Sequence, residues 1–149
     1  MSTPYELVCA VETARPADKA ELFRLTRALE SEAAVSGPTQ IRAALQDVRY
    51  LSPATRQVYA DLATRQAQVV MLARGLPSYL AAGVRGVDLD EHDPLVDQWC
   101  VVLAGGTTPV VLAATDLQVQ GVVDMARSFS YAVSRDLFVV QDCLAVLTR

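Results

Sequence analysis

The chain has 149 residues, of which 52% are hydrophobic and 20% charged, and its formal net charge is −4. This length and composition fit one globular domain with a buried core and exclude a disordered segment. The acidic balance argues against a nucleic-acid-binding surface, which needs a basic face. No apolar run approaches the ~18 residues of a membrane span, and the N-terminus lacks a signal-peptide pattern. We therefore expect a cytoplasmic protein that binds neither nucleic acid nor membrane directly.

The first clear element of the chain is a helix over residues 18–35. Asp18 and Glu21 have the spacing of a capping box, and apolar residues follow at helical intervals until Gly37. The helical spacing of these apolar residues predicts that Arg27 and Glu30 lie outside the apolar stripe. The preceding residues 1–17 are expected to form an N-terminal helix or extension.

A strand, a helix and a second strand are predicted next. Residues 39–45 indicate a short strand. Ser52 as N-cap and Pro53 at the first helical position predict a helix that reaches about residue 64. The continuous apolar run over residues 68–73 indicates a buried strand. This order allows one parallel crossover.

The middle of the chain is dominated by a buried hairpin. Residues 75–86 are punctuated by glycine and proline and indicate a connection with one helical turn, and residues 87–89 a short edge strand. Residues 99–104 and 110–115 then form two apolar runs around Gly105-Gly106. This pattern is typical of a hairpin at the centre of a sheet.

The C-terminal part predicts one more strand and a helix. Apolar residues alternate over residues 128–133, and Ser134 is expected to cap the final helix. The whole chain, residues 1–149, is thus predicted to be a single domain of the α/β (α+β) class. We expect a mixed, mostly antiparallel sheet of about five strands, with helices packed on it.

The acidic loop around the single histidine, His92, holds the densest set of potential metal ligands. A calcium-binding loop needs glycine at its sixth position and glutamate at its twelfth. Counted from Asp88, these positions hold Asp93 and Trp99. We therefore predict no metal site, and interpret the segment as a solvated loop in which Asp93 caps the turn after Pro94.

No catalytic residues are predicted from the remaining patterns. A small hydrolase that uses the His92 loop, with Cys100 as nucleophile, is one alternative. Cys100 lies within an apolar run, however, and like Cys9 and Cys143 it is expected to be an inert thiol in a reducing compartment. The residues Gly105-Gly106 precede a proline and a strand, so they indicate a turn rather than a phosphate-binding loop.

Four residues are the best candidates for a ligand site: Arg49, Tyr50, Tyr59 and Trp99. The aromatic side chains combine a large apolar body with a polar group, which suits the lining of a pocket. Arg49 lies just before a helix start, where an anion is favoured. A purely structural interpretation competes with this one: Tyr59 and Trp99 belong to the core, Tyr50 is half-buried and Arg49 is solvated.

In four ordered blocks the chain resembles the DICT family of bacterial sensory domains. The blocks are residues 25–30 (LTRALE), Leu45-Gln46 with Arg49-Tyr50 and residues 59–63 (YADLA), Asp93-Pro94-Leu95 with Trp99 and the hairpin, and Arg127-Ser128-Phe129 with the last helix. Together they span about residues 18–147. Two positions depart from the family pattern, because Gln98 and Ser130 stand where glutamate is common.

This resemblance implies a regulatory input domain. Such domains occur beside diguanylate cyclases, phosphodiesterases, two-component kinases and MerR-type DNA-binding domains, and have been proposed to sense light or small molecules. No cofactor follows from it. Our leading expectation is a non-enzymatic domain that binds a small-molecule ligand or a signalling partner. The alternatives are an interaction or dimerisation module that acts on a separate signalling protein, including a homodimer, and the His92 hydrolase.

Overall fold

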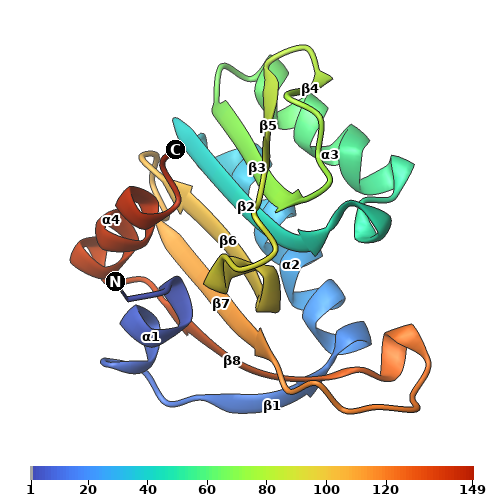
Figure 1. The fold of residues 1–149 in the computed structure, drawn as a ribbon. Coiled ribbons are helices and arrows are strands. Elements are labelled where there is room, and N and C mark those ends of the chain that lie inside the picture. Colours follow the sequence, from blue (N-terminus) through green and yellow to red (C-terminus); the bar gives the residue numbers. More distant parts are fainter. Residues whose placement is uncertain (1) are drawn as a thin grey trace.

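The structure, a computed structural model, describes residues 2–149 and is built on one sheet of eight strands (Figure 1). Their order across the sheet is β1-β8-β7-β6-β2-β3-β5-β4. The strands are β1 (Arg15–Asp18), β2 (Gln40–Asp47), β3 (Gln68–Arg74), β4 (Tyr79–Ala81), β5 (Val84–Asp88), β6 (Gln98–Ala104), β7 (Val110–Asp116) and β8 (Ser128–Ser134). The α-helices are α1 (Pro4–Cys9), α2 (Lys19–Ser36), α3 (Pro53–Thr64) and α4 (Leu137–Val146).

The predicted fold class is confirmed. The chain is a single α/β domain whose sheet is mixed and mostly antiparallel: only the β2–β3 and β3–β5 pairs are parallel. The parallel β2–α3–β3 crossover was expected from the element order. Three short 3-10 helices complete the described residues: η1 (Val48–Tyr50), η2 (Pro94–Asp97) and η3 (Asp124–Ala126).

The predicted number of about five strands is wrong, because short strands depend on distant partners. β1 has four residues and only one buried side chain, so its sequence shows no alternation of apolar and polar residues. It is a strand because it pairs with β8. In place of the predicted helical turn, the three residues of β4 pair with β5 and form the sheet edge. β5 therefore lies inside the sheet, where the sequence indicated an edge strand.

The predicted cap of the last helix is also wrong. Asp136, and not Ser134, is the N-cap of α4, and its carboxylate accepts hydrogen bonds from the backbone N–H groups of Phe138 and Val139. Ser134 is buried at the end of β8 and accepts from the backbone N–H of Asp136. The helix start is shifted by two residues because β8 continues through Ser134.

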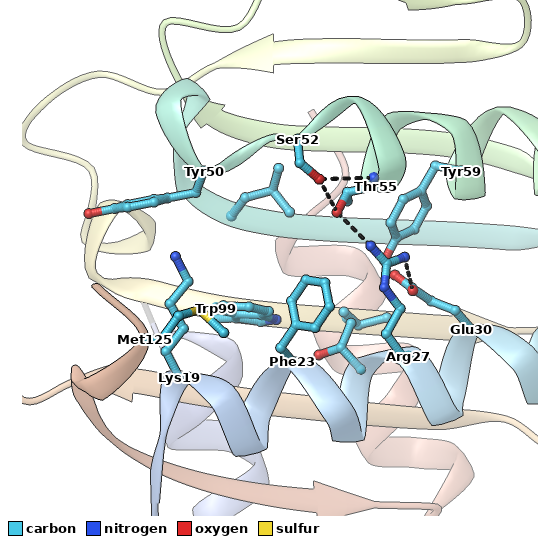
Figure 2. A pocket seen from close by; sticks show the side chains of 13 residues that line it. Lys19, Phe23, Arg27, Glu30, Tyr50, Ser52, Thr55, Tyr59, Trp99 and Met125 are labelled. Carbon is cyan, nitrogen blue, oxygen red and sulfur yellow. Dashed lines mark hydrogen bonds and ion pairs between the residues drawn. The ribbon is translucent and has the colours of Figure 1, made fainter. Parts of the chain in front are cut away.

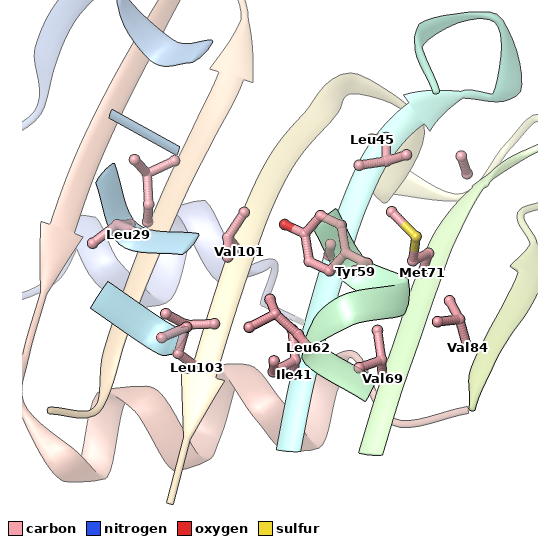
Figure 3. Close-up of a cluster of buried hydrophobic side chains, with 14 of the residues drawn as sticks. Leu29, Ile41, Leu45, Tyr59, Leu62, Val69, Met71, Val84, Val101 and Leu103 are labelled. Atoms are coloured by element: carbon pink, nitrogen blue, oxygen red, sulfur yellow. The ribbon is translucent and has the colours of Figure 1, made fainter. Parts of the chain in front are cut away.

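The helices cover the two faces of the sheet in pairs (Figure 1). α2 and α3 pack on one face and α1 and α4 on the other. Alternation along β2 separates the two cores, because Ile41, Ala43 and Leu45 belong to the first and Ala44 to the second. Figure 3 shows the first core, where α3 side chains such as Leu62 lie over the strands. No helix within residues 2–149 has the length and apolar character needed to cross a membrane.

Candidate functional site

A cavity of about 240 Å³ lies between α2 and α3, over the sheet (Figure 2). Figure 2 shows Lys19 and Phe23 of α2 facing Tyr50 and Ser52 across it. Its lining comprises Lys19, Phe23, Thr26, Arg27 and Glu30 from α2; Tyr50, Ser52, Thr55 and Tyr59 from the opposite wall; Leu45, Val101 and Trp99 from the sheet; and Met125.

The sequence of α2 determines which side chains face the cavity. Lys19, Phe23, Thr26, Arg27 and Glu30 are spaced so that they share one side of a helix. The helix is fixed at both ends. Asp18 accepts a hydrogen bond from the backbone N–H of Glu21, and Gly37 ends the helix in the left-handed conformation at φ +68°.

The opposite wall depends on an irregularity at the end of β2. The register of β2 with β3 shifts between Ala44 and Asp47, and Gln46 lies there at φ +75°. Such bulges bend a strand and redirect the chain. The chain then runs through η1, which carries Tyr50, and into α3, whose N-cap is Ser52. Sequence patterns of strand and helix miss this bulge, although it positions Tyr50.

One end of the cavity is cationic because of Lys19, the single lysine of the chain. Its side chain is only 8% exposed, and its Nζ donates to Asp124 Oδ2 at 2.6 Å. The same Nζ lies 4.0 Å from the centre of the Tyr50 ring and 5.9 Å from that of Trp99. Burial lowers the pKa of Lys19, and Asp124 opposes this shift. The ammonium group is thus enclosed by aromatic rings and held by one carboxylate.

The other end of the cavity holds an ion pair whose carboxylate is buried. Arg27 Nη1 lies 2.8 Å from Glu30 Oε1, and Arg27 Nη2 donates to Thr55 Oγ1 at 2.8 Å. Glu30 is only 5% exposed, which corrects its predicted place off the buried stripe. Burial raises the pKa of Glu30, and the neighbouring Tyr59 hydroxyl and Arg27 oppose the shift. Burial likewise raises the pKa of Tyr59, and the neighbouring charge of Glu30 adds to it.

Three buried polar atoms of the lining have no hydrogen-bond partner within residues 2–149. They are Thr26 Oγ1, Trp99 Nε1 and the Tyr59 hydroxyl, which lies beside the Glu30 carboxylate without a hydrogen bond of good geometry. A buried polar group without a partner costs about 1–3 kcal/mol, and such groups are rare in native proteins. All three residues line one cavity, but the atoms themselves are shielded, so a bound molecule reaches them only if their side chains turn toward it.

A network of polar side chains lies against Tyr50, outside the cavity lining. Arg127 forms ion pairs with Asp116 and Asp124 and donates to Gln46 Oε1 at 3.0 Å. Its guanidinium carbon lies 4.6 Å from the centre of the Tyr50 ring. Burial alone would raise the pKa of Asp116, but hydrogen bonds from the Gln118 backbone, Arg127 and Gln46 hold that pKa below its ordinary value. Beyond Tyr50 this network borders an outer polar cleft of about 380 Å³.

The structure brings three of the four predicted site residues into one cavity. Tyr50, Tyr59 and Trp99 line it, while Arg49 is exposed and lines the outer cleft. The Arg49 guanidinium still lies 4.9 Å from the centre of the Tyr50 ring. Tyr59 is buried in the core, as the structural interpretation holds, whereas Trp99 is half-buried.

Sequence reasoning missed the contribution of α2 to the site. Lys19, Thr26, Arg27 and Glu30 were not among the candidates, although they provide most of the polar groups of the lining. A signal was present, because Lys19, Phe23, Thr26 and Glu30 follow one another along the apolar stripe of the helix. A lysine and a glutamate on the side of a helix that faces the sheet indicate a polar site within the core.

The acidic loop does not form a comparable site. The side chain of His92 is 88% exposed, and its Nε2 lies 3.5 Å from Glu91 Oε1. Asp93 caps η2, as predicted, and pairs with Arg149. Within residues 2–149 no group of three or more metal-ligating side chains comes together.

The Cys–His alternative finds no support in the positions of its two groups. Cys100 is fully buried in the core beneath α1 and α4, and burial raises the pKa of its thiol far above the ordinary value. His92, in contrast, faces solvent. A buried, protonated thiol cannot be activated by an imidazole that faces solvent, so the two groups do not form a nucleophile–base pair.

The two departures from the family pattern lie on the α1 side of the sheet, away from the cavity. Gln98 Oε1 accepts from the backbone N–H of Tyr5 at 3.2 Å, and Ser130 Oγ lies 2.8 Å from the Tyr5 hydroxyl. Both side chains therefore hold α1 on the sheet. Neither is part of the cavity lining.

Comparison with protein families gives a match over most of the chain. The DICT model, described as "Sensory domain in DIguanylate Cyclases and Two-component system", matches residues 2–116. The resemblance seen in the sequence is thereby confirmed, although its fourth block lies beyond the match. Every residue of the cavity lining except Met125 lies within the matched range. Among curated proteins, no match is found.

Solved structures share the fold at low sequence identity. A polyphosphate kinase from Porphyromonas gingivalis aligns with a TM-score of 0.62 at 14% identity, over 95% of this chain and 26% of its own. Nuc, a phospholipase D family member from Salmonella typhimurium, aligns with a TM-score of 0.55 at 13% identity, over 91% of both chains. TrmBL2, an archaeal chromatin protein, aligns with a TM-score of 0.51 at 13% identity, over 92% of this chain and 51% of its own. At these identities the likeness concerns the fold alone.

Proposed function

The chain belongs to the DICT family of sensory domains, and from this membership we propose that it is a non-enzymatic sensor whose ligand binds in the cavity between α2 and α3. The ligand would be a small molecule, and its binding would be passed on to a signalling partner. Tyr50, Tyr59 and Trp99 are proposed to contact it, and Arg49 to act at the outer cleft beside Tyr50.

One observation carries this proposal: the three buried polar atoms of the cavity lining that lack partners. A domain that only needed a stable core would gain by replacing Thr26 and Tyr59 with apolar residues of the same shape. A binding site keeps such groups, because the ligand supplies the missing hydrogen bonds. Burial of aromatic walls around few polar groups is also typical of small-molecule sites.

The proposal is tested by screening a library of small molecules for thermal stabilisation of the purified domain. Compounds that bind the folded state raise its unfolding temperature. We expect hits whose effect shrinks in Tyr59→Phe but not in Tyr5→Phe, a matched change on the other face of the sheet. A library without hits, or hits equally weakened by Tyr5→Phe, would contradict the proposal.

A second candidate function is an interaction or dimerisation module. It is favoured by the segment between β7 and β8, residues 117–127, which we call the β7–β8 segment. Its apolar side chains are unusually exposed: Leu117 50%, Val119 49%, Val122 42%, Val123 76% and Met125 47%. Apolar side chains gathered on one surface segment are typical of contact sites for other proteins.

Sedimentation at several protein concentrations tests this candidate. We expect self-association, or capture of a signalling partner, that is lost in Val123→Asp. Val35→Asp is the matched control, because Val35 is 90% exposed on α2 and lies outside the segment. A chain that stays monomeric at every concentration and captures no partner would contradict this function.

A further inference from the structure

We propose that the cavity takes a small aromatic carboxylate, and that its carboxylate replaces Asp124 at Lys19. This inference rests on the proposed function and specifies the chemical class of the ligand. It also gives the ligand a way to act on the β7–β8 segment, which carries Asp124 and Met125.

The Lys19 end of the cavity is suited to an anion. An ammonium group has three N–H donors, and Lys19 uses one of them on Asp124. Lys19 is also the first residue of α2, where the helix dipole adds positive potential. At the other end Arg27 is already paired with Glu30 and bonded to Thr55. The cation whose carboxylate partner is exposed enough to be replaced is therefore Lys19, since the side chain of Asp124 is 49% exposed and that of Glu30 only 4%.

The atoms without partners favour a ligand with hydrogen-bond acceptors. Trp99 Nε1 can only donate, and the hydroxyls of Thr26 and Tyr59 donate as well as accept. An amine ligand would lack an acceptor for Trp99 and would be repelled by Lys19. Once these side chains turn toward the cavity, oxygen atoms of a carboxylate or carbonyl group satisfy their donors without a charge conflict.

The walls favour an aromatic ring of modest size. Phe23, Tyr50, Tyr59 and Trp99 provide aromatic surface on several sides of the cavity. Its volume of about 240 Å³ is below the ~300–1,000 Å³ of pockets for drug-sized ligands. Lys19 and Thr26 are seven residues apart on α2, about 10 Å along the helix axis. One or two rings with a short acidic arm match this space.

Asp124 is placed to give way to such a ligand. Its side chain is 49% exposed, and while Oδ2 contacts Lys19, Oδ1 accepts from Arg127 at 3.2 Å. It can therefore leave Lys19 and remain paired with Arg127 and solvated. The next residue, Met125, lines the cavity. Displacement of Asp124 thus removes one of the contacts that hold the β7–β8 segment on α2.

The class of ligand is tested with four probes of matched shape. Phenylacetate, phenylacetamide and phenethylamine carry a negative, a neutral and a positive group on the same ring, and acetate lacks the ring. Binding is followed by the fluorescence of Trp99, the only tryptophan of the chain. We expect phenylacetate to bind at least about tenfold more tightly than each of the other three, as for a charge-assisted hydrogen bond.

Two variants are expected to act in opposite directions. Lys19→Met removes the preference for phenylacetate over phenylacetamide, whereas Asp124→Asn strengthens phenylacetate binding by removing its competitor. The controls Arg56→Gln and Asp142→Asn make the same changes of charge at exposed positions outside the cavity. Circular dichroism establishes that each variant is folded. The probe series on the unmodified domain needs no variant, so it decides the question even if Lys19→Met unfolds.

The outcomes separate this inference from the proposed function. The inference is overturned if phenylacetamide or phenethylamine binds as tightly as phenylacetate or more tightly. It is also overturned if the preference for phenylacetate over phenylacetamide survives Lys19→Met, or if phenylacetate binds more weakly to Asp124→Asn. If the compound library yields hits at Tyr59 but phenylacetate does not bind, the carboxylate class is wrong while the proposed function stands. If the library yields no hits either, both are wrong.

Discussion

The two faces of the sheet differ in how their buried polar groups are treated. The face beneath α1 and α4 is packed with apolar side chains, and its buried polar side chains are hydrogen-bonded: Gln98 to the Tyr5 backbone, and Arg42 to the Ile41 backbone and Gln68, although Arg42 Nε lacks a partner. The face beneath α2 and α3 encloses a cavity with a lysine, an ion pair and three of the five buried side-chain polar atoms that lack partners in residues 2–149. Under the proposed function, the first face mainly provides stability, and the second gives up some stability for a binding site.

The largest expected effect concerns the packed face. Leu72 is fully buried in β3 beneath α1 and α4, so Leu72→Ala leaves a cavity and lowers the free energy of unfolding by about 2–5 kcal/mol. Phe23→Ala, at the wall of the existing cavity, removes more atoms but fewer contacts and is expected to cost less. Urea unfolding measures both. A larger loss for Phe23→Ala would contradict the contrast between the faces.

A smaller loss is expected where the polar network borders the cavity. Asp116→Asn weakens the pairing with Arg127, and since both side chains are only 13–14% exposed, we expect a loss of about 1–3 kcal/mol at neutral pH. The pKa of Asp116 is lowered in the folded state. Its contribution is therefore present above the unfolded pKa and is lost as the pH falls through the folded pKa.

Unfolding experiments from pH 7 to pH 3 measure this effect. The difference in stability between the unmodified domain and Asp116→Asn should shrink steadily on acidification. Asp142→Asn, an exposed change of the same kind, should show little difference at any pH. A difference between the domain and Asp116→Asn that is constant with pH would contradict the assignment of this ion pair.

A gain in stability is expected on the open face. Thr26→Val removes a hydroxyl that lacks a partner, so it should raise the free energy of unfolding by up to about 1 kcal/mol, whereas Tyr59→Phe, whose hydroxyl lies beside the Glu30 carboxylate, should gain less. Each should also weaken the hits of the compound screen. Tyr5→Phe, which breaks the contact with Ser130, should instead lower stability. Loss of stability in both cavity variants would show that their hydroxyls already have partners.

The smallest expected effect is the reaction of the buried thiols with a labelling reagent in the folded domain. Cys100 and Cys143 are buried beneath α1 and α4, and burial raises the pKa of Cys143 to about 12. At pH 8 a thiol reagent should therefore modify neither while the domain is folded, and both once it is unfolded. Mass spectrometry after labelling measures this. Rapid labelling of Cys100 in the folded domain would show that this face opens easily.

The sequence predicted the regular parts of the molecule better than its irregular ones. α2, α3 and the β6–β7 hairpin follow from periodicity and caps such as Asp18 and Ser52, which act over a few residues. β1 and β4 were missed because they depend on pairing with distant strands. Local patterns carry no information on such partners.

The candidate site was predicted in part for the same reason. Tyr50, Tyr59 and Trp99 were identified by residue type, and the fold brings them to one cavity. The ion-pair partner of Lys19 could not be predicted from the sequence, because Asp124 is 105 residues away along the chain. The absence of partners for Thr26 and Tyr59 is likewise a property of three-dimensional packing and leaves no local pattern.

The central claim is that the face beneath α2 and α3 binds a small molecule. The most direct test is a protein NMR titration with the strongest hit of the compound screen, following the single indole N–H signal of Trp99 and the backbone amides. We predict that the Trp99 signal shifts with amides of α2, η1 and α3, while those of α1 and α4 stay in place. Shifts centred on α1 and α4, or an unchanged Trp99 signal at saturation, would contradict it.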